Sequence, residues 1–169
     1  RSIRSIAQKV GVCFHVGSQC MNPNSYAIAI QRVGDLIRSS GIMLDILDVG
    51  GGFPSRYIDM NPPPLDTYIE EITAALIEIP IREDCEIWAE PGRGLVAEAA
   101  STVVRIDHRK DNYLYINDGI YGSLFDAGLS AFIHPVRPIN IQSKLSDELV
   151  PFSFFGPTCD GMDFMKGPY

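Results

Sequence analysis

Groups suited to binding an anion follow three predicted strands, at residues 10–16, 44–49 and 85–89. The candidate residues, at the ends of these strands and in the loops after them, are His15, Ser18, Gly50, Gly51, Gly52, Glu90, Pro91, Gly92 and Arg93. Glycines let backbone N–H groups approach an anion, a serine adds a hydroxyl donor, and the planar guanidinium of arginine suits phosphate. Because ligands collect at the carboxyl ends of parallel strands, we expect the three loops to share one opening. The sequence therefore predicts a phosphate site.

Each of these residues has a plainer interpretation when taken alone. A glycine triplet after a strand is more often a tight turn than a phosphate cradle. His15 fits a hydrogen-bonded core histidine as well as a cofactor contact, and Glu90 with Arg93 fits a local salt bridge. Cys159, in a later loop, fits a buried small apolar residue, because this is the usual role of a free cysteine. The functional interpretation depends on these features lining one opening together.

The segments between the three strands predict helices. Turn residues at 22–25 precede apolar residues at helical spacing, and Gly41 supplies a stop. A second apolar face runs through residues 65–79, with prolines before and after it. The alternation of strand and helix predicts parallel strands joined by right-handed crossovers.

The pattern changes after Gly94. Runs at 97–106, 113–117 and 150–155 predict strands without helical periods between them, and the polar run 107–112 predicts a hairpin loop. We therefore place a boundary near Ala97, between an α/β part and an antiparallel β part.

The composition argues against several classes of function. The 169 residues carry 14 Lys and Arg against 21 Asp and Glu, a net charge of −7, so we expect no nucleic-acid partner. No apolar stretch approaches the roughly 18 to 20 residues of a membrane helix, and residues 1–9 lack a signal-peptide core, so we expect a cytoplasmic protein without a membrane partner. The four cysteines predict neither disulfides nor a metal site. The abrupt ends suggest part of a longer polypeptide.

Five segments occur in an order that resembles one known family. They are FHVGSQ (14–19), DVGGGFP (48–54), EPGR (90–93), NDGIYGS (117–123) and GPTCDGMD (156–163). Together they resemble the ornithine decarboxylase family of pyridoxal-phosphate enzymes, which has the alanine-racemase-like fold type. The resemblance implies an α/β fold in which residues 1–96 form the C-terminal half of a TIM (β/α)8 barrel. Residues 97–169 would form part of a β-barrel or sandwich domain.

The resemblance also implies roles in binding pyridoxal phosphate. His15 matches a histidine that stacks on the cofactor ring, and Glu90 matches the carboxylate that faces the pyridine nitrogen. The residues implied to surround the phosphate are Ser18, Gly50, Gly51, Gly52, Pro91, Gly92 and Arg93. An ionised Glu90 would keep the ring nitrogen protonated, which makes the ring a strong electron sink when carbon dioxide departs.

Four residues of the second part match positions near the substrate or the subunit boundary. Cys159 matches the cysteine that protonates the product carbanion from across a dimer interface, and Tyr121 resembles a residue near that interface. Asp160 matches a residue near the distal amine of the substrate, where it would pair with the second ammonium of a diamino acid. Asp126 is a candidate substrate contact, although its spacing differs from that of the family's aspartate.

The resemblance therefore implies decarboxylation of ornithine to putrescine, with lysine to cadaverine as a second reaction, in a homodimer with shared active sites. The alternatives are a diaminopimelate or arginine decarboxylase of the same fold, and an inactive regulatory homologue of the antizyme-inhibitor kind. The family's Schiff-base lysine lies upstream of the first strand. None of the chain's lysines has a matching context: Lys9, Lys110, Lys144 and Lys166. We expect that lysine to lie outside this chain.

Overall fold

The computed structural model describes residues 3–129, 133–139, 144 and 146–169. The chain forms two compact units. The first comprises Arg1–Arg56 and Asn61–Ala100, and the second comprises Tyr57–Met60 and Ser101–Tyr169. The division between Ala100 and Ser101 lies a few residues after the predicted boundary near Ala97. The sequence pattern did not indicate that residues 57–60 belong to the second unit.

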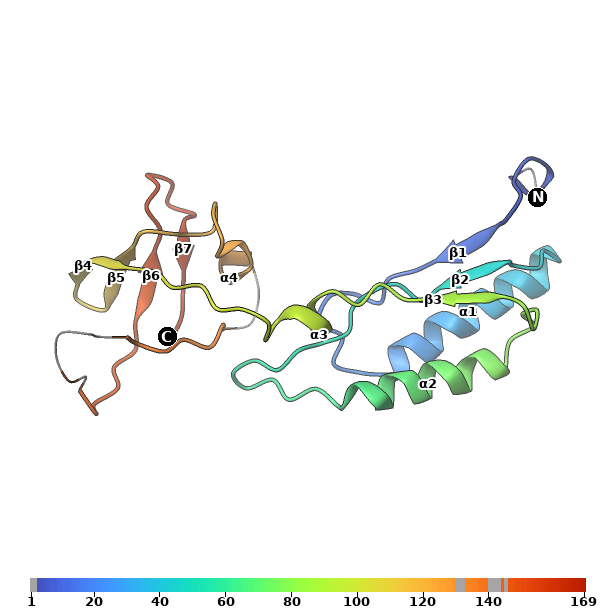
Figure 1. Cartoon of the computed structure of the whole chain (residues 1–169), viewed down its shortest axis with the longest axis horizontal. Coiled ribbons are helices and arrows are strands. Elements are labelled where there is room, and N and C mark those ends of the chain that lie inside the picture. The colour runs from blue at the N-terminus through green and yellow to red at the C-terminus, as the bar shows by residue number, and fades with distance from the viewer. Residues whose placement is uncertain (1–2, 130–132, 140–143, 145) are drawn as a thin grey trace. The chain divides into compact units, whose positions relative to one another are not determined.

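The first unit is built on three parallel strands in the order β1-β2-β3 (Figure 1). The predicted alternation of strand and helix is confirmed, although each strand is shorter than its apolar run. A 3-10 turn, Ile3–Ser5, precedes the sheet. The elements that follow are β1 (Gly11–Cys13), α1 (Asn24–Ser40), β2 (Ile46–Asp48), α2 (Leu65–Ile77), β3 (Glu86–Trp88) and α3 (Arg93–Val96).

Both long helices begin and end at residues that the sequence marks. Helix α1 begins after Pro23, and the Asn24 amide donates to the Asn22 side chain at 3.1 Å. It ends at Gly41, whose φ of 65° is left-handed and whose N–H donates to the carbonyl of Ile37. Helix α2 follows Pro64 and ends at Ile77, before the proline that closes the apolar pattern.

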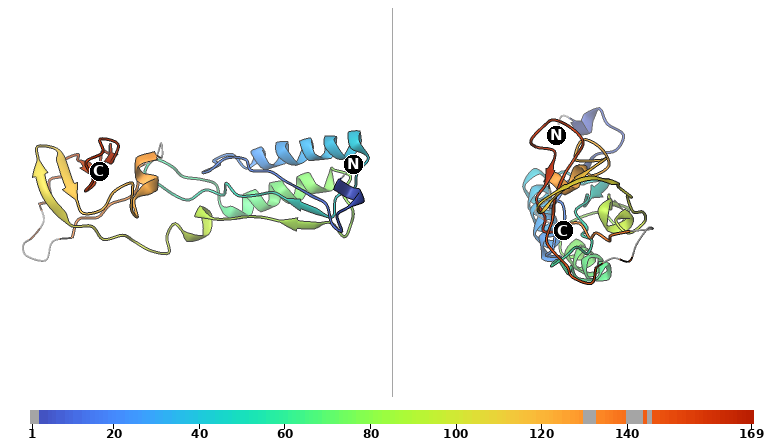
Figure 2. Two further views of the ribbon diagram at one scale, coloured as in Figure 1. Left: turned by 90° about the horizontal axis from the view of Figure 1, so that it is seen from above. Right: turned by 90° about the vertical axis from the view of Figure 1, so that its left-hand side faces the viewer.

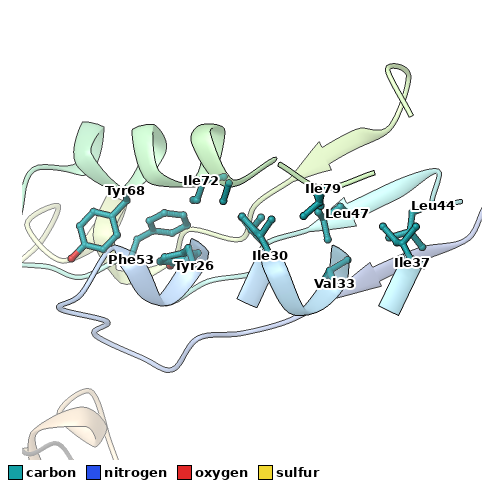
Figure 3. Packing of buried hydrophobic residues seen from close by; sticks show 12 residues of the cluster. Tyr26, Ile30, Val33, Ile37, Leu44, Leu47, Phe53, Tyr68, Ile72 and Ile79 are labelled. Atoms are coloured by element: carbon teal, nitrogen blue, oxygen red, sulfur yellow. The ribbon is translucent and has the colours of Figure 1, made fainter. Parts of the chain in front are cut away.

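The core of the first unit lies between the two helices and one face of the sheet (Figure 3). The buried side chains come from α1, β2, α2 and the segments next to them, namely Tyr26, Ile30, Val33, Ile37, Leu44, Leu47, Val49, Phe53, Tyr68, Ile72, Ala75 and Ile79. Strand β3 is exposed along its length, and Trp88 keeps 51% of its surface accessible. The helices therefore cover one face of a sheet whose β3 edge remains open.

The second unit contains a four-stranded sheet in the order β4-β5-β6-β7. The β4–β5 hairpin can be followed in yellow in Figure 2. The β4/β5 and β6/β7 pairs are antiparallel, whereas β5/β6 is parallel. The elements are β4 (Ile106–Lys110), β5 (Tyr113–Ile116), α4 (Phe125–Leu129), β6 (Ser153–Phe155) and β7 (Phe164–Met165).

Several predictions for this unit are wrong. Residues 97–105 form no strand, and β4 instead occupies most of the polar run predicted as a loop. The turn is restricted to Asp111, with φ of 52°, and Asn112. The parallel β5/β6 pair also contradicts a purely antiparallel sheet. Because β4 is an edge strand exposed at every residue, it tolerates charged side chains that an interior strand would not.

Two elements of the second unit were not predicted. Helix α4 and strand β7 were not among the elements that the sequence pattern predicted. Among the described residues, no helix is both long enough and apolar enough to cross a membrane.

Candidate active site

A pocket of about 210 Å³ lies in the first unit, where the three strands end. It is lined by residues of all three predicted loops: His15, Ser18, Gln19, Gly51, Gly52, Phe53, Glu90, Gly92 and Arg93. Seven of the nine candidate residues of these loops therefore meet at one opening. Gly50 and Pro91 do not line it, although each is adjacent in the chain to residues that do. The predicted shared opening of the loops is present.

Backbone hydrogen bonds fasten the three loops to one another. The Phe14 amide donates to the carbonyl of Asp48 at 3.2 Å, and the Glu90 amide donates to the carbonyl of Gly50 at 2.9 Å. The Cys20 amide donates to the carbonyl of Gly52 at 2.8 Å. The sheet pairing thus continues past the strands and sets the separation of the three pocket walls.

The glycine turn has a conformation that other residues would not fit. Gly50 has φ of 68° and Gly52 has φ of 107°, both left-handed. A Cβ atom on Gly50 would overlap the carbonyl oxygen of Phe14, and one on Gly52 would lie 2.5 Å from the carbonyl oxygen of Gly17. The Asp48 carboxyl group accepts the Gly50 amide at 2.8 Å and so supports the turn from within the loop. The triplet is therefore a turn whose backbone forms a pocket wall.

Tyr26 supports the same turn from α1, a role that the sequence analysis did not identify. Its hydroxyl donates to the carbonyl oxygen of Gly51 at 2.9 Å, and its side chain is fully buried. The ring stacks on Phe53 with 5.0 Å between centroids, next to Tyr68 (Figure 3). Burial raises the pKa of Tyr26 far above its usual range, so the phenol remains a donor. Its position one turn before Ile30 identifies it in the sequence as a core residue, but the sequence pattern gives no sign of the hydrogen bond.

His15 faces the glycine turn. Its Nδ1 accepts the amide of Gly17 at 2.9 Å, which places the proton of the neutral ring on Nε2. A Cβ atom on Gly51 would lie 3.1 Å from that Nε2, so the absence of a side chain at Gly51 leaves room for the imidazole. His15 is exposed, which excludes the interpretation as a core histidine.

Gln19 and Phe53 also line the pocket and were not predicted. Gln19 has a left-handed φ of 57°, and its amide group forms two hydrogen bonds to the backbone of Ser55, at 2.5 and 3.1 Å. The Gln19 side chain therefore holds the segment that follows the glycine turn. A left-handed non-glycine residue gives no signal in a single sequence.

The third loop contributes Glu90, Gly92 and Arg93. Glu90 is exposed on the pocket wall, while Arg93, the first residue of α3, is half-buried. The space beside Gly92 is open, because no atom lies within 4 Å of a Cβ placed there. A ligand can therefore approach the backbone at Gly92 without displacing protein atoms.

The candidate residues of the second unit lie in two loops. Asp160 accepts the Tyr121 hydroxyl at 2.5 Å and the Met162 amide at 2.9 Å. The Tyr121 hydrogen bond lowers the pKa of Asp160, and the same bond raises the pKa of Tyr121. Cys159 is an exposed free thiol and not a buried hydrophobe. Asp126 lies in the first turn of α4.

Two further structural observations concern metals and thiols. Among residues 3–129, 133–139, 144 and 146–169, no group of three His, Cys, Asp or Glu side chains is arranged to hold a metal ion. All four cysteines are free.

Comparisons with known proteins agree on one family. A family model described as the pyridoxal binding domain of pyridoxal-dependent decarboxylases matches residues 4–97. An ornithine decarboxylase from Panagrellus redivivus is 34% identical, covering 91% of this chain and 40% of the relative. Antizyme inhibitor 2 from Xenopus laevis is 32% identical, covering 91% of this chain and 38% of the relative.

A solved structure is similar over the same extent. The lysine/ornithine decarboxylase from Vibrio vulnificus, solved with cadaverine, superposes with a TM-score of 0.73 and 35% identity, covering 92% of this chain and 43% of that one. The chain thus spans about two fifths of the length of these relatives. Because the family model covers more than half of the chain and places the pocket loops within it, the chain belongs to the pyridoxal-dependent decarboxylase family.

Proposed function

We propose that this chain forms part of a pyridoxal-phosphate-dependent decarboxylase of basic amino acids, with ornithine as the preferred substrate and lysine as a second one. The family's cofactor is pyridoxal phosphate. The observation that carries the proposal is the pocket at the ends of β1, β2 and β3. It is lined by hydrogen-bond donors that can bind an anion, by an imidazole and by a carboxyl group.

The donor groups of the pocket fit a phosphate. Among the described residues, the amide N–H groups of Gly51, Gly52 and Gly92 donate to no other group, and neither does the Ser18 hydroxyl. The guanidinium of Arg93 adds a positive charge on the same wall. Bare glycine backbone, a hydroxyl and a guanidinium together form a site of the kind that binds phosphate monoesters.

The remaining polar groups fit a pyridine ring. We assign His15 to the ring face, because its imidazole lies along the glycine turn with Nδ1 held by Gly17. We assign Glu90 to the ring nitrogen, where an ionised carboxyl group would hold a proton on that nitrogen. When bound, the cofactor supplies an electron sink for the bond that loses carbon dioxide.

The finer architecture is part of the same proposal. We interpret the β1-α1-β2-α2-β3 order as the C-terminal half of a TIM barrel, because its sheet is parallel and its helices lie on one face. The open edge at β3 is consistent with further strands. We place the Schiff-base lysine outside residues 1–169, and we propose a homodimer in which residues of the second unit complete the site of the partner subunit.

Asp160 is the basis for the choice of substrate. Its pKa is lowered by the Tyr121 hydrogen bond, so the carboxyl group stays ionised and can pair with a distal ammonium. Diaminopimelate carries a carboxylate beside the ammonium at that end, and an ionised Asp160 would repel this carboxylate. Pocket depth, which separates ornithine from lysine, would depend partly on the loop 124–135, of which 130–132 lie outside the described residues.

An inactive regulatory homologue is the second candidate, since antizyme inhibitor 2 is 32% identical to this chain. Pseudoenzymes tend to lose the residues that hold a cofactor. Here His15, Ser18, Glu90 and Arg93 line one pocket, and Cys159 is present as well. These residues favour the enzyme.

A competition assay tests the proposal. The complete gene product that contains this chain is loaded with pyridoxal phosphate and offered ornithine, lysine, arginine and diaminopimelate. We expect amine formation fastest from ornithine, and an Asp160→Ala variant that loses about tenfold or more in its preference for ornithine over diaminopimelate. Asp107→Ala, on the exposed β4 strand, is the control. A protein that makes no amine from any substrate, or that prefers diaminopimelate, contradicts the proposal.

A further inference from the structure

Asp163 is a buried carboxyl group in the second unit to which the site described above assigns no role. Its side chain is 1% exposed, and both carboxyl oxygens are engaged. Oδ1 accepts the amide of Ile120 at 2.9 Å. Oδ2 accepts the amide of Thr158 at 3.1 Å and the Thr158 hydroxyl at 2.7 Å. These three donors come from two loops that are far apart in the sequence.

We name these loops by the candidate residues that they carry. The tyrosine loop, residues 117–123, contains Tyr121, and the cysteine loop, residues 156–163, contains Cys159 and Asp160. Asp163 belongs to the cysteine loop and reaches into the tyrosine loop through Ile120. The two loops meet again at the exposed surface, where the Tyr121 hydroxyl donates to Asp160.

Both loops have a glycine where they pass the Asp163 carboxyl group. A Cβ atom at Gly119, in the tyrosine loop, would overlap Oδ1, and so would one at Gly156, in the cysteine loop. The backbone of Asp163 completes the arrangement, because its carbonyl accepts the Gly156 amide at 2.8 Å and its amide donates to the Asp160 carbonyl at 3.0 Å. The backbone of both loops is therefore shaped around this one side chain.

We propose that Asp163 is a positioning residue that holds Cys159 and Asp160 in register with Tyr121. The inference rests on the proposed function, in which Cys159 supplies a proton and Asp160 pairs with the distal ammonium. Because Asp163 is buried, it acts through the loop backbone and not on the substrate. Loss of one of its acceptors leaves a buried N–H group without a partner, which the loop can relieve only by moving.

The location of the hydrogen bonds separates this role from general stabilisation. Met165, in strand β7, stabilises the unit through an apolar cluster with Ile116 and Ile120 and forms no side-chain hydrogen bond to either loop that the structure describes. The donors to the Asp163 carboxyl group instead lie in the two loops that carry the candidate residues. The predicted effect is therefore on the outcome of each turnover as well as on stability.

The experiment uses the complete gene product with its cofactor and four variants. Asp163→Asn keeps the shape but replaces one acceptor with a donor, and Thr158→Val removes the hydroxyl that donates to Oδ2. Thr158→Ser retains that hydroxyl and serves as the conservative rescue. Ser153→Ala is the matched control, because it removes a hydrogen bond of 2.6 Å to the Lys166 carbonyl at the β6/β7 pair, outside both loops.

Two measurements are made on each variant. The first is the amine formed per carbon dioxide released from ornithine, which falls below one when the carbanion is protonated at the wrong atom. The second is hydrogen–deuterium exchange in the peptides that contain the two loops, which needs no activity. We expect Asp163→Asn and Thr158→Val to lower the amine yield and to speed exchange in both loops by about threefold or more. Thr158→Ser and Ser153→Ala should match the wild type.

Each outcome decides one question. Faster exchange with an unchanged amine yield would show that Asp163 has only a structural role, which overturns the inference. Unchanged exchange in the tyrosine loop of Thr158→Val would also overturn it. If Asp163→Asn does not fold, Thr158→Val and its serine counterpart decide alone. If the wild type forms no amine from any substrate, the proposed function fails, and the positioning of a reaction fails with it. The exchange data then still show whether the carboxyl group couples the loops.

Discussion

The Tyr26 hydroxyl donates a hydrogen bond of 2.9 Å to the carbonyl oxygen of Gly51, so a core residue of α1 holds one wall of the pocket. The neighbouring Gly52 also lies against the phenol, because a Cβ atom there would be 3.2 Å from that hydroxyl. The phenol is therefore both a packing element and the support of a loop that lines the pocket. Stability and cofactor binding should change together when it is removed.

Tyr26→Phe tests this relationship. Loss of the hydroxyl leaves the buried Gly51 carbonyl without a donor, which should lower the free energy of unfolding by about 1 to 3 kcal/mol and weaken pyridoxal phosphate binding. Urea denaturation and a cofactor titration measure the two effects. Tyr68→Phe is the control, because the Tyr68 hydroxyl donates to the carbonyl of Cys20 at 2.8 Å and not to a carbonyl of the glycine turn. Equal cofactor affinity in both variants would contradict the link.

Arg93→Ala should weaken cofactor binding by about 1.5 to 3 kcal/mol, the usual value of a hydrogen bond to a charged group. The physical reason is the loss of the guanidinium from the wall that carries the free amides of Gly51 and Gly92. Equilibrium titration with pyridoxal phosphate measures the change. Arg38→Ala serves as the control, since Arg38 pairs with Asp35 on the exposed surface of α1. An unchanged affinity would remove Arg93 from the phosphate site.

Glu90→Gln should retain the cofactor but slow decarboxylation by about tenfold or more, because a neutral amide stabilises a protonated ring nitrogen less than a carboxylate does. Cofactor titration and the turnover rate with ornithine separate binding from chemistry. Glu86→Gln, two residues earlier on β3, is a matched change, and it loses an ion pair with Lys9 on the exposed edge. Full turnover by the Glu90 variant would disprove the assignment to the ring nitrogen.

The contrast between the two units shows what a single sequence can predict. In the first unit the glycines, prolines and apolar spacing determine α1 and α2, and parallel strands bring the ends of β1, β2 and β3 to one edge, so the pocket follows from local signals. The contribution of Tyr26 could not be predicted, because its hydrogen bond joins residues 25 positions apart.

The errors in the second unit have a different physical cause. Strand β4 is exposed at every residue, so burial imposes no apolar alternation on Asp107–Lys110, and the pattern there resembles a loop. The apolar run that begins at Ala97 forms no strand until Ile106. Asp163 was part of a recognised segment, but its role depends on Ile120 and Thr158, which only the folded chain brings together.

Cys159→Ala should leave carbon dioxide release nearly intact but lower the amine formed per carbon dioxide. Cys159 is an exposed free thiol, and an S–H group can donate a proton to the carbanion. Without that donor, protonation elsewhere would leave the amino group on the cofactor, and hydrolysis by water would release an aldehyde in place of the amine. Simultaneous assay of carbon dioxide and amine in the complete gene product measures the ratio. Cys13→Ala, at another exposed thiol, is the control, and a ratio of one in the Cys159 variant would rule out the proton-donor role.

Tyr121→Phe should change how catalysis responds to acid. In the structure, the pKa of Asp160 is lowered first by the Tyr121 hydrogen bond and then by the Met162 amide, so the carboxyl group remains ionised to lower pH than an ordinary aspartate. Removal of the phenol raises that pKa toward its usual value near 4. The carboxyl group then takes up its proton, and loses its attraction for the substrate ammonium, at a higher pH.

We expect the acid limb of kcat/KM for ornithine to move upward in pH, with KM affected more than kcat. Rate profiles that extend below the ordinary aspartate pKa, from about pH 3 to 7, measure the shift, and Tyr113→Phe, on β5, is the control. Superimposable acid limbs for the wild type and Tyr121→Phe would show that the phenol does not set the charge of Asp160.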